Sequence, residues 1–176
     1  AINGLESDGD LRYPFIQNDG ITIYYADNGS NSIGGYDIFV SRYNSSTDRY
    51  LVPENIGMPF NSPANDYLYV IDEVNNLGWF ATDRNMPNGK VCVYTFIPNE
   101  TRQIYNEAET GMEALRRYAS IYSIRDTWTD KNRVDKALQN LKSLQMTKKA
   151  GNAAGSFEFV LNDKKTCNTE ADFKNP

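Results

Sequence analysis

The sequence predicts a mainly β protein with an α-helical C-terminal part: two four-stranded antiparallel sheets, then a pair of helices and a short strand. Three observations support this fold class. Residues 1–105 hold 16 of the 22 aromatic residues and every proline except Pro176. Within this region an order of strand, turn, strand, polar loop and strand occurs twice. After residue 105, apolar residues recur with the spacing of amphipathic helices.

The first predicted sheet begins with a hairpin. Residues 13–17 are rich in aromatic and β-branched side chains, as is the return strand at 21–26. Between them stands Asn18-Asp19-Gly20, which ends in the Asp-Gly pair that favours tight hairpin turns. A polar loop at 27–35 leads to a third strand at 36–42, and a turn at 44–47 leads to a fourth at 49–52.

The second predicted sheet repeats this order. Strands are expected at 67–71, 77–81 and 90–94, and Asp83-Arg84-Asn85 takes the place of the first polar loop. Tyr13 matches Tyr67 at an offset of 54, and Tyr24 matches Trp79 at 55, which implies one inserted residue. Repeats of about 40–50 residues with four strands each are typical of propeller blades. We therefore predict two propeller-type blades, at about 10–62 and 63–105, and a second part at 106–176.

The predicted faces of the strands favour a blade. In the strand at 21–26, one face is expected to carry Ile21, Ile23 and Tyr25, and the other face Tyr24. In the run at 91–97, large side chains occupy both faces. An antiparallel sheet with one wet face alternates more cleanly between apolar and polar residues. Both faces are therefore expected to be covered.

Several motifs resemble a known family. Tyr13-Pro-Phe-Ile16, Asn18-Asp-Gly20, Gly34-Gly-Tyr-Asp-Ile38 and Asn55-Ile-Gly57 resemble the WD40-like repeat of TolB-type β-propellers, in the form found in periplasmic and outer-membrane-associated proteins of Bacteroidetes. The second copy departs from the pattern, because Gly89-Lys-Val-Cys-Val93 has no aspartate like Asp37. The resemblance covers roughly residues 10–100. It implies a binding or scaffolding role outside the cytoplasm, in the periplasm or at the outer membrane, without catalysis.

The C-terminal part is predicted to hold two helices and a strand. Leu115, Tyr118, Ala119 and Tyr122 follow helical spacing within a helix at about 107–124. Thr129 or Asp130 is expected to cap a second helix, which ends before the glycines at 151 and 155. Alternating apolar residues predict a last strand at 157–161, with a turn at 162–163.

Composition excludes several kinds of partner and site. The net charge of −5 argues against nucleic acid, and no run of apolar residues is long enough for a membrane-spanning segment. Without histidine, the chain can form no Ser-His or Cys-His nucleophile pair. Cys92 and Cys167 are too few for a structural zinc site; a bridge between them stays open. Since two blades cannot close a ring, the chain is expected to be a piece of a longer one.

The loops of the two repeats supply the candidate binding residues. Acidic and amide side chains there suit calcium, although the same residue types also stabilise tight turns. Asp37 with Asp83 or Glu73 could form the carboxylate pair of a glycosidase, although no spacing enforces it. An aromatic platform of Tyr24, Tyr25, Trp79 and Phe80 could bind sugar rings or a partner loop, although core packing also explains it. The candidate ligand- or partner-binding residues are Tyr24, Asp27, Asn28, Asp37, Trp79, Asp83 and Arg84, and no residue is assigned a catalytic or metal-binding role.

The functional expectation is a non-catalytic protein-interaction or scaffold module of the cell envelope. The alternatives are a carbohydrate-binding or carbohydrate-processing module, and the propeller part of a larger peptidase.

Overall fold

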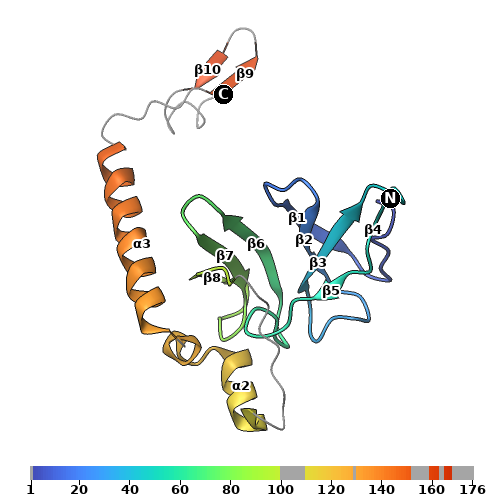
Figure 1. Ribbon diagram of the computed structural model, residues 1–176, viewed down its shortest axis with the longest axis horizontal. Coiled ribbons are helices and arrows are strands. Elements are labelled where there is room, and N and C mark those ends of the chain that lie inside the picture. Colours follow the sequence, from blue (N-terminus) through green and yellow to red (C-terminus); the bar gives the residue numbers. More distant parts are fainter. Residues whose placement is uncertain (1, 100–109, 129, 152–158, 163–164, 168–176) are drawn as a thin grey trace. The chain divides into compact units, whose positions relative to one another are not determined.

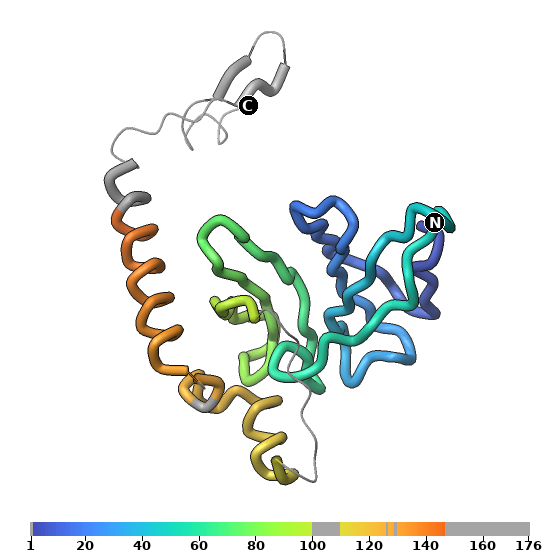
Figure 2. The backbone as a smooth tube through the Cα atoms, in the orientation of Figure 1, coloured from blue at the N-terminus to red at the C-terminus, as the bar shows by residue number. Residues whose placement is uncertain are grey.

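A computed structural model describes residues 2–99, 110–128, 130–151, 159–162 and 165–167 of the chain (Figure 1). It contains two compact units, Ala1–Ala137 and Leu138–Pro176. The first unit holds both large sheets, and the tube drawing follows its chain through them in sequence order (Figure 2). The predicted boundary at residue 105 lies outside the described residues.

The first sheet has five strands. The strands β1 (Leu11–Ile16), β2 (Thr22–Asp27), β3 (Asp37–Asn44) and β4 (Arg49–Tyr50) are neighbours in that order. A further short strand, β5 (Glu54–Asn55), also pairs with β3. The predicted fourth strand at 49–52 is thus shorter than expected and is followed by a fifth, because two brief stretches of backbone pair with different parts of one long strand.

The second sheet has three strands in the part of the chain that the structure describes. They are β6 (Asp66–Asp72), β7 (Leu77–Thr82) and β8 (Cys92–Phe96), again in sequence order. The prediction of two four-stranded sheets is therefore wrong for both, while the mainly β class and the antiparallel order are confirmed. Among the described residues the two sheets do not close into a propeller.

The two sheets repeat each other with a constant offset of 55 residues. Phe15 pairs with Tyr24 in the first sheet, and Val70 pairs with Trp79 in the second. Each opening strand carries a bulge at the same place, with Tyr13 and Leu68 both at φ 55°. The prediction of one inserted residue is therefore wrong: Tyr13 corresponds to Leu68, because the aromatic side chain next to the bulge shifted by one position between the copies.

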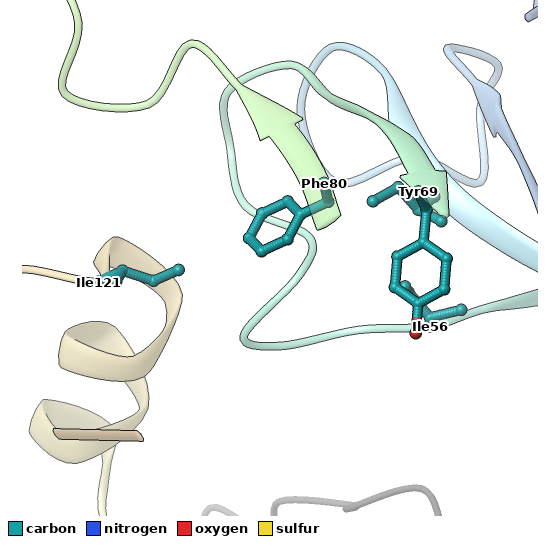
Figure 3. Close-up of a cluster of buried hydrophobic side chains, with 5 residues drawn as sticks. Ile56, Tyr69, Phe80 and Ile121 are labelled. Atoms are coloured by element: carbon teal, nitrogen blue, oxygen red, sulfur yellow. The ribbon is translucent and has the colours of Figure 1, made fainter. Parts of the chain in front are cut away.

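The main core lies where the first sheet packs against the second. Ile38 and Ile56 from the first repeat meet Tyr69 and Phe80 from the second, and Ile121 joins them from beyond the second sheet. Figure 3 labels four of these side chains, Ile56, Tyr69, Phe80 and Ile121. The opposite face of the first sheet has its own cluster, formed by Leu5, Ile23, Tyr25 and Phe39, with Tyr50 against it. Both faces of the first sheet are thus covered, as predicted. The same prediction is wrong for the second sheet, because Val91 and Val93 of the run at 91–97 are 49% and 60% exposed.

A buried polar side chain ties β3 to the segment that leads from the first sheet to the second. The fully buried amide of Asn61 accepts a hydrogen bond from the Ile38 backbone N–H at 2.8 Å and donates one to the Ile38 carbonyl at 2.8 Å. It thereby pairs with β3 as a strand would. Nearby, a Cβ atom on Gly35 would lie 2.1 Å from the Asn65 side-chain oxygen, so only glycine allows this approach between the repeats.

Helices follow the second sheet. They are α2 (Met112–Ser120), the short 3₁₀ helix η1 (Ile124–Thr127) and α3 (Lys131–Gly151). The predicted first helix at 107–124 is therefore shorter: α2 ends at Ile121, which adopts a left-handed conformation, and residues 107–109 lie outside the description. Asp130 accepts hydrogen bonds from the Asn132 and Arg133 backbone N–H groups, which confirms the predicted cap.

The C-terminal unit includes a hairpin of β9 (Phe159–Asn162) and β10 (Lys165–Cys167). One of these strands overlaps the predicted strand at 157–161. The other was not expected, because a run of Lys, Thr and Cys carries little apolar signal.

Candidate functional site

The predicted site residues do not form one cluster. Tyr24 lies between the sheets, with its ring centroid 4.5 Å from that of Tyr69. Trp79, its counterpart in the second repeat, lies on the opposite side of the second sheet and is partly exposed. Tyr25 and Phe80 are buried in two different clusters. The four aromatics predicted as one platform therefore lie on separate faces.

Asn28 and Asp83 carry out the same task in the two repeats. The Asn28 side-chain oxygen accepts the Asp10 backbone N–H at 2.6 Å, and Asp83 Oδ1 accepts the Asn65 backbone N–H at 2.8 Å. Both bonds join the loop after the second strand to the residue just before the first strand. These two side chains thus close equivalent loops, which is the structural role that sequence analysis left open.

Asp27 on β2 and Asp37 on β3 are directly opposite each other in the antiparallel pairing of these strands. Asp27 Oδ1 accepts hydrogen bonds from Ser7 Oγ at 2.7 Å and from the Gly29 backbone N–H at 2.8 Å. Burial, together with the Asp27 charge, raises the pKa of the neighbouring Tyr25 to about 12. Two carboxyl groups therefore lie side by side at this end of the first sheet.

Asp37 is fully buried and incompletely hydrogen-bonded. Its Oδ2 accepts from the Ile33 backbone N–H at 2.9 Å and from Asn55 Nδ2 at 2.6 Å, whereas its Oδ1 has no hydrogen-bond partner. Burial raises the pKa of this carboxyl group. Asp37 therefore holds the loop before β3 to the segment around β5.

Arg84 is a buried residue at the centre of a network. Its guanidinium lies 2.5 Å from the fully buried carboxylate of Asp66 and also donates to Thr82 Oγ1, with the Phe80 ring centroid 5.6 Å away. Three backbone carbonyls accept its remaining donors, those of Pro59, Phe60 and Ala119. All five donors of the guanidinium are thus satisfied. A loop arginine in an acidic sequence gave no signal of this burial.

Glu73 and Asp83, the two alternatives for pairing with Asp37, lie apart from each other. Glu73 lies in the turn after β6 and Asp83 follows β7, so they stand at opposite ends of the same hairpin. Within the described part of the chain, no three carboxylates or thiols gather where a metal ion could be held. Cys92 is a free thiol, and the side chain of Cys167 lies outside the description.

A pocket that sequence analysis missed lies against the first sheet. It has a volume of about 460 Å³, and its walls combine a stacked aromatic pair with carboxylates and amides. The lining residues are Glu6, Tyr25, Asp27, Asn31, Phe39, Val52, Pro53 and Asn55. Of these, only Asp27 and Tyr25 were named as candidates from the sequence, because the pocket joins the N-terminal segment to strands distant in sequence.

A second feature is the outer face of the second sheet, defined by Val70, Trp79, Ala81, Val93 and Thr95; its β8 residues Val93 and Thr95 are exposed, whereas Ala81 is buried. Val93 is 60% exposed. The residues 55 positions earlier are Phe15, Tyr24, Ala26, Ile38 and Val40, and among them Tyr24, Ile38 and Val40 belong to the core between the sheets. The outer face is therefore the counterpart of a face that is covered in the first repeat.

Comparisons of the chain with protein-family models, with curated proteins and with solved structures find no match.

Proposed function

We propose that the chain is a non-catalytic protein-interaction module, and that its two sheets are successive propeller-type blades. One observation carries the proposal. The outer face of the second sheet corresponds, residue for residue, to the face with which the first sheet packs on the second. A face of this kind is suited to receive another sheet, and the partner we propose is a sheet of the same repeat type.

The composition of the outer face supports this partner. It combines Trp79 and three aliphatic side chains with Thr95, and carries no charged group. Aromatic residues are enriched and charged residues depleted at the centres of protein interfaces. The resemblance to TolB-type repeats adds the proposal that the module acts in the cell envelope. No helix among the described residues is long and apolar enough to cross a membrane.

Self-association tests the proposal, because a second copy of the chain presents sheets of the required type. Sedimentation velocity of the wild type is expected to show association that rises with concentration, and Val93→Lys is expected to abolish it. Val74→Lys is the matched control, since Val74 is 90% exposed in the turn between β6 and β7. A wild-type chain that stays monomeric at every concentration would overturn the proposed partner.

The carbohydrate alternative is tested with a glycan array. Specific oligosaccharide binding that is lost in Trp79→Ala would show that the chain binds carbohydrate and would overturn the proposed protein-interaction function. If the wild type binds no glycan, the interaction module stands.

A further inference from the structure

The chain contains three Asn-Gly pairs, Asn3-Gly4, Asn28-Gly29 and Asn88-Gly89. An asparagine in such a pair can react with its own backbone, because the nitrogen of the next residue can attack the side-chain amide carbon. Glycine favours this attack, since it has no side chain beside the nitrogen and leaves the backbone free to rotate. Whether a pair reacts therefore depends on how firmly the fold holds the two groups.

Both reacting groups of the Asn28-Gly29 pair are held. The Asn28 side-chain oxygen accepts the Asp10 backbone N–H at 2.6 Å, and the Gly29 N–H donates to Asp27 Oδ1 at 2.8 Å. The surroundings are also crowded, because a Cβ atom at Gly29 would lie 2.4 Å from Ser7 Oγ. A reaction within this pair must therefore first break two hydrogen bonds.

The Asn3-Gly4 pair is held through its backbone. The Asn3 carbonyl accepts the Tyr50 N–H at 2.9 Å, and a Cβ atom at Gly4 would lie 2.3 Å from the Tyr50 carbonyl oxygen. The Gly4 nitrogen can reach the Asn3 side chain only if the peptide plane between the two residues turns. That rotation breaks the hydrogen bond from Tyr50 and is hindered by the close packing on β4.

The Asn88-Gly89 pair has neither kind of restraint. It occupies the centre of an exposed turn between β7 and β8, which is closed by a hydrogen bond from the Lys90 N–H to the Pro87 carbonyl at 3.0 Å. Gly89 has φ 77°, and apart from its chain neighbours no atom lies within 4 Å of a Cβ placed there. The Asn88 side chain and the Gly89 N–H form no hydrogen bond with another residue that the structure describes.

We propose that Asn88 is a site of spontaneous deamidation, at which the side-chain amide is replaced by a carboxylate. The Gly89 nitrogen loses its proton and bonds to Asn88 Cγ, the bond between Cγ and Nδ2 breaks, and the amide leaves with that proton as ammonia. Water then opens the cyclic imide at either of its two carbonyls and gives aspartate or isoaspartate. The reaction needs no oxidant and no reactant other than water, and it does not depend on the proposed interaction function.

The modification has a defined local effect. It adds a negative charge beside Lys90, in the turn that leads into β8. The isoaspartate form also inserts a methylene group into the backbone between Pro87 and Lys90, the two residues whose hydrogen bond closes the turn. The turn is therefore expected to change while the pairing of β7 with β8 remains.

Peptide mapping of the full chain by mass spectrometry tests the site. Trypsin cleaves after lysine and arginine and places the three pairs in separate peptides, 1–12, 13–42 and 85–90. The folded chain is incubated at mildly alkaline pH, which favours loss of the attacking proton, and fragmentation of each peptide locates the altered residue. Conversion at Asn88 is expected to be at least about fivefold faster than at Asn3 or Asn28, since breaking one hydrogen bond of typical net strength slows a reaction by about that factor.

Two controls separate the effect of the fold from that of the sequence. In concentrated urea, where no pair is held, the preference for Asn88 is expected to disappear. Asn88→Gln keeps an amide but requires a larger ring, so the 85–90 peptide is expected to stay unmodified, whereas Asn31→Gln, in another exposed loop, is expected to leave conversion at Asn88 unchanged.

Three results would overturn the inference. They are a folded chain in which Asn88 stays unmodified, one in which Asn3 or Asn28 converts as fast as Asn88, and a preference for Asn88 that persists unchanged in urea. Because Asn88 is exposed in a turn, Asn88→Gln is expected to fold as the wild type does, and its thermal unfolding checks this.

Discussion

Replacing Arg84 by methionine tests the energetic centre of the second repeat. The substitution keeps an unbranched side chain of similar reach but removes the guanidinium, which hydrogen-bonds five acceptors. The carboxylate of Asp66, with no exposed surface, loses its cationic partner. It keeps two hydrogen bonds, from the Ser62 backbone N–H at 2.7 Å and from Ser62 Oγ at 2.8 Å.

The expected loss is large for a single substitution. Breaking a buried ion pair by removing one partner costs about 3–5 kcal/mol, because an uncompensated charge stays buried. Because the two hydrogen bonds from Ser62 remain, the loss of stability expected for Arg84→Met lies near the lower end of this range, at about 3–4 kcal/mol. That is a major part of the 5–15 kcal/mol by which typical domains are stable. Much of this cost comes from the uncompensated buried charge of Asp66. Adding Asp66→Asn to the Arg84→Met variant should therefore recover about 2 kcal/mol of unfolding free energy.

Urea unfolding of the two single variants and the double variant measures these terms as a double-mutant cycle. Arg49→Met serves as the control, since its exposed ion pair with Glu6 is worth at most about 1 kcal/mol. The reasoning fails if Arg84→Met costs no more than Arg49→Met. It also fails if the effects of Arg84→Met and Asp66→Asn simply add, because a shared buried charge requires coupling between them.

Three further substitutions probe features of the first repeat and of the segment that follows it. Asp37→Asn is expected to be more stable than the wild type at pH 7 by about 1 kcal/mol and to lose this advantage at pH 3. The reason is that the pKa of Asp37 is raised in the folded protein, so its ionisation opposes folding as pH rises. Chemical unfolding of both proteins at the two pH values measures the difference, and a difference that does not change with pH would contradict this reasoning. Asp19→Ala should cost about 1–2 kcal/mol at neutral pH, because Asp19 accepts bonds from the Ile21 and Thr22 backbone and the Thr22 hydroxyl. These bonds lower the pKa of Asp19, so its contribution disappears as pH falls through that lowered value, and a pH-independent cost would argue against this role. Asn61→Ala should cost about 1–3 kcal/mol in urea unfolding, since the Ile38 N–H loses its partner while the Ile38 carbonyl keeps the bond from the Ile56 N–H; a loss below about 1 kcal/mol would show that this side chain does not hold β3 in place.

The strands of the two hairpins could be predicted because each combines regular alternation with strong turn signals. The structure confirms the hairpins around Gly20 and between β6 and β7, and the opposite facing of Tyr24 and Tyr25. Strand β5 escaped prediction because a two-residue strand is defined only by its partner β3. The bulges escaped because they interrupt alternation at only one point. The apparent offset of 54 came from aligning Tyr13 with Tyr67, whereas the bulge places Tyr13 opposite Leu68 in the repeat.

The candidate site could be predicted only in part. Asp27 was identified as a polar loop residue, and it does line the pocket. Tyr25 lies in the same strand and was named in the predicted platform. The remaining walls come from the N-terminal segment, the loop after β2, β3 and the chain after β4, which no local pattern connects. Arg84 was identified by its loop position, but its burial depends on carbonyls 24 to 35 residues away in sequence.

The Asn61 side chain has a consequence for how the molecule opens. Because its oxygen accepts the Ile38 N–H, β3 cannot separate from the segment that leads to the second sheet without leaving this N–H unsatisfied in the interior. That segment is joined to the second sheet where β6 begins, and there the Asp66 N–H donates to the Tyr36 carbonyl at 2.6 Å. The two sheets are therefore expected to melt in a single transition although each has its own hydrogen-bonded ladder. The Ile38 amide should exchange its hydrogen with solvent only when the whole β unit unfolds, at the same free energy as the slowest amides of β7.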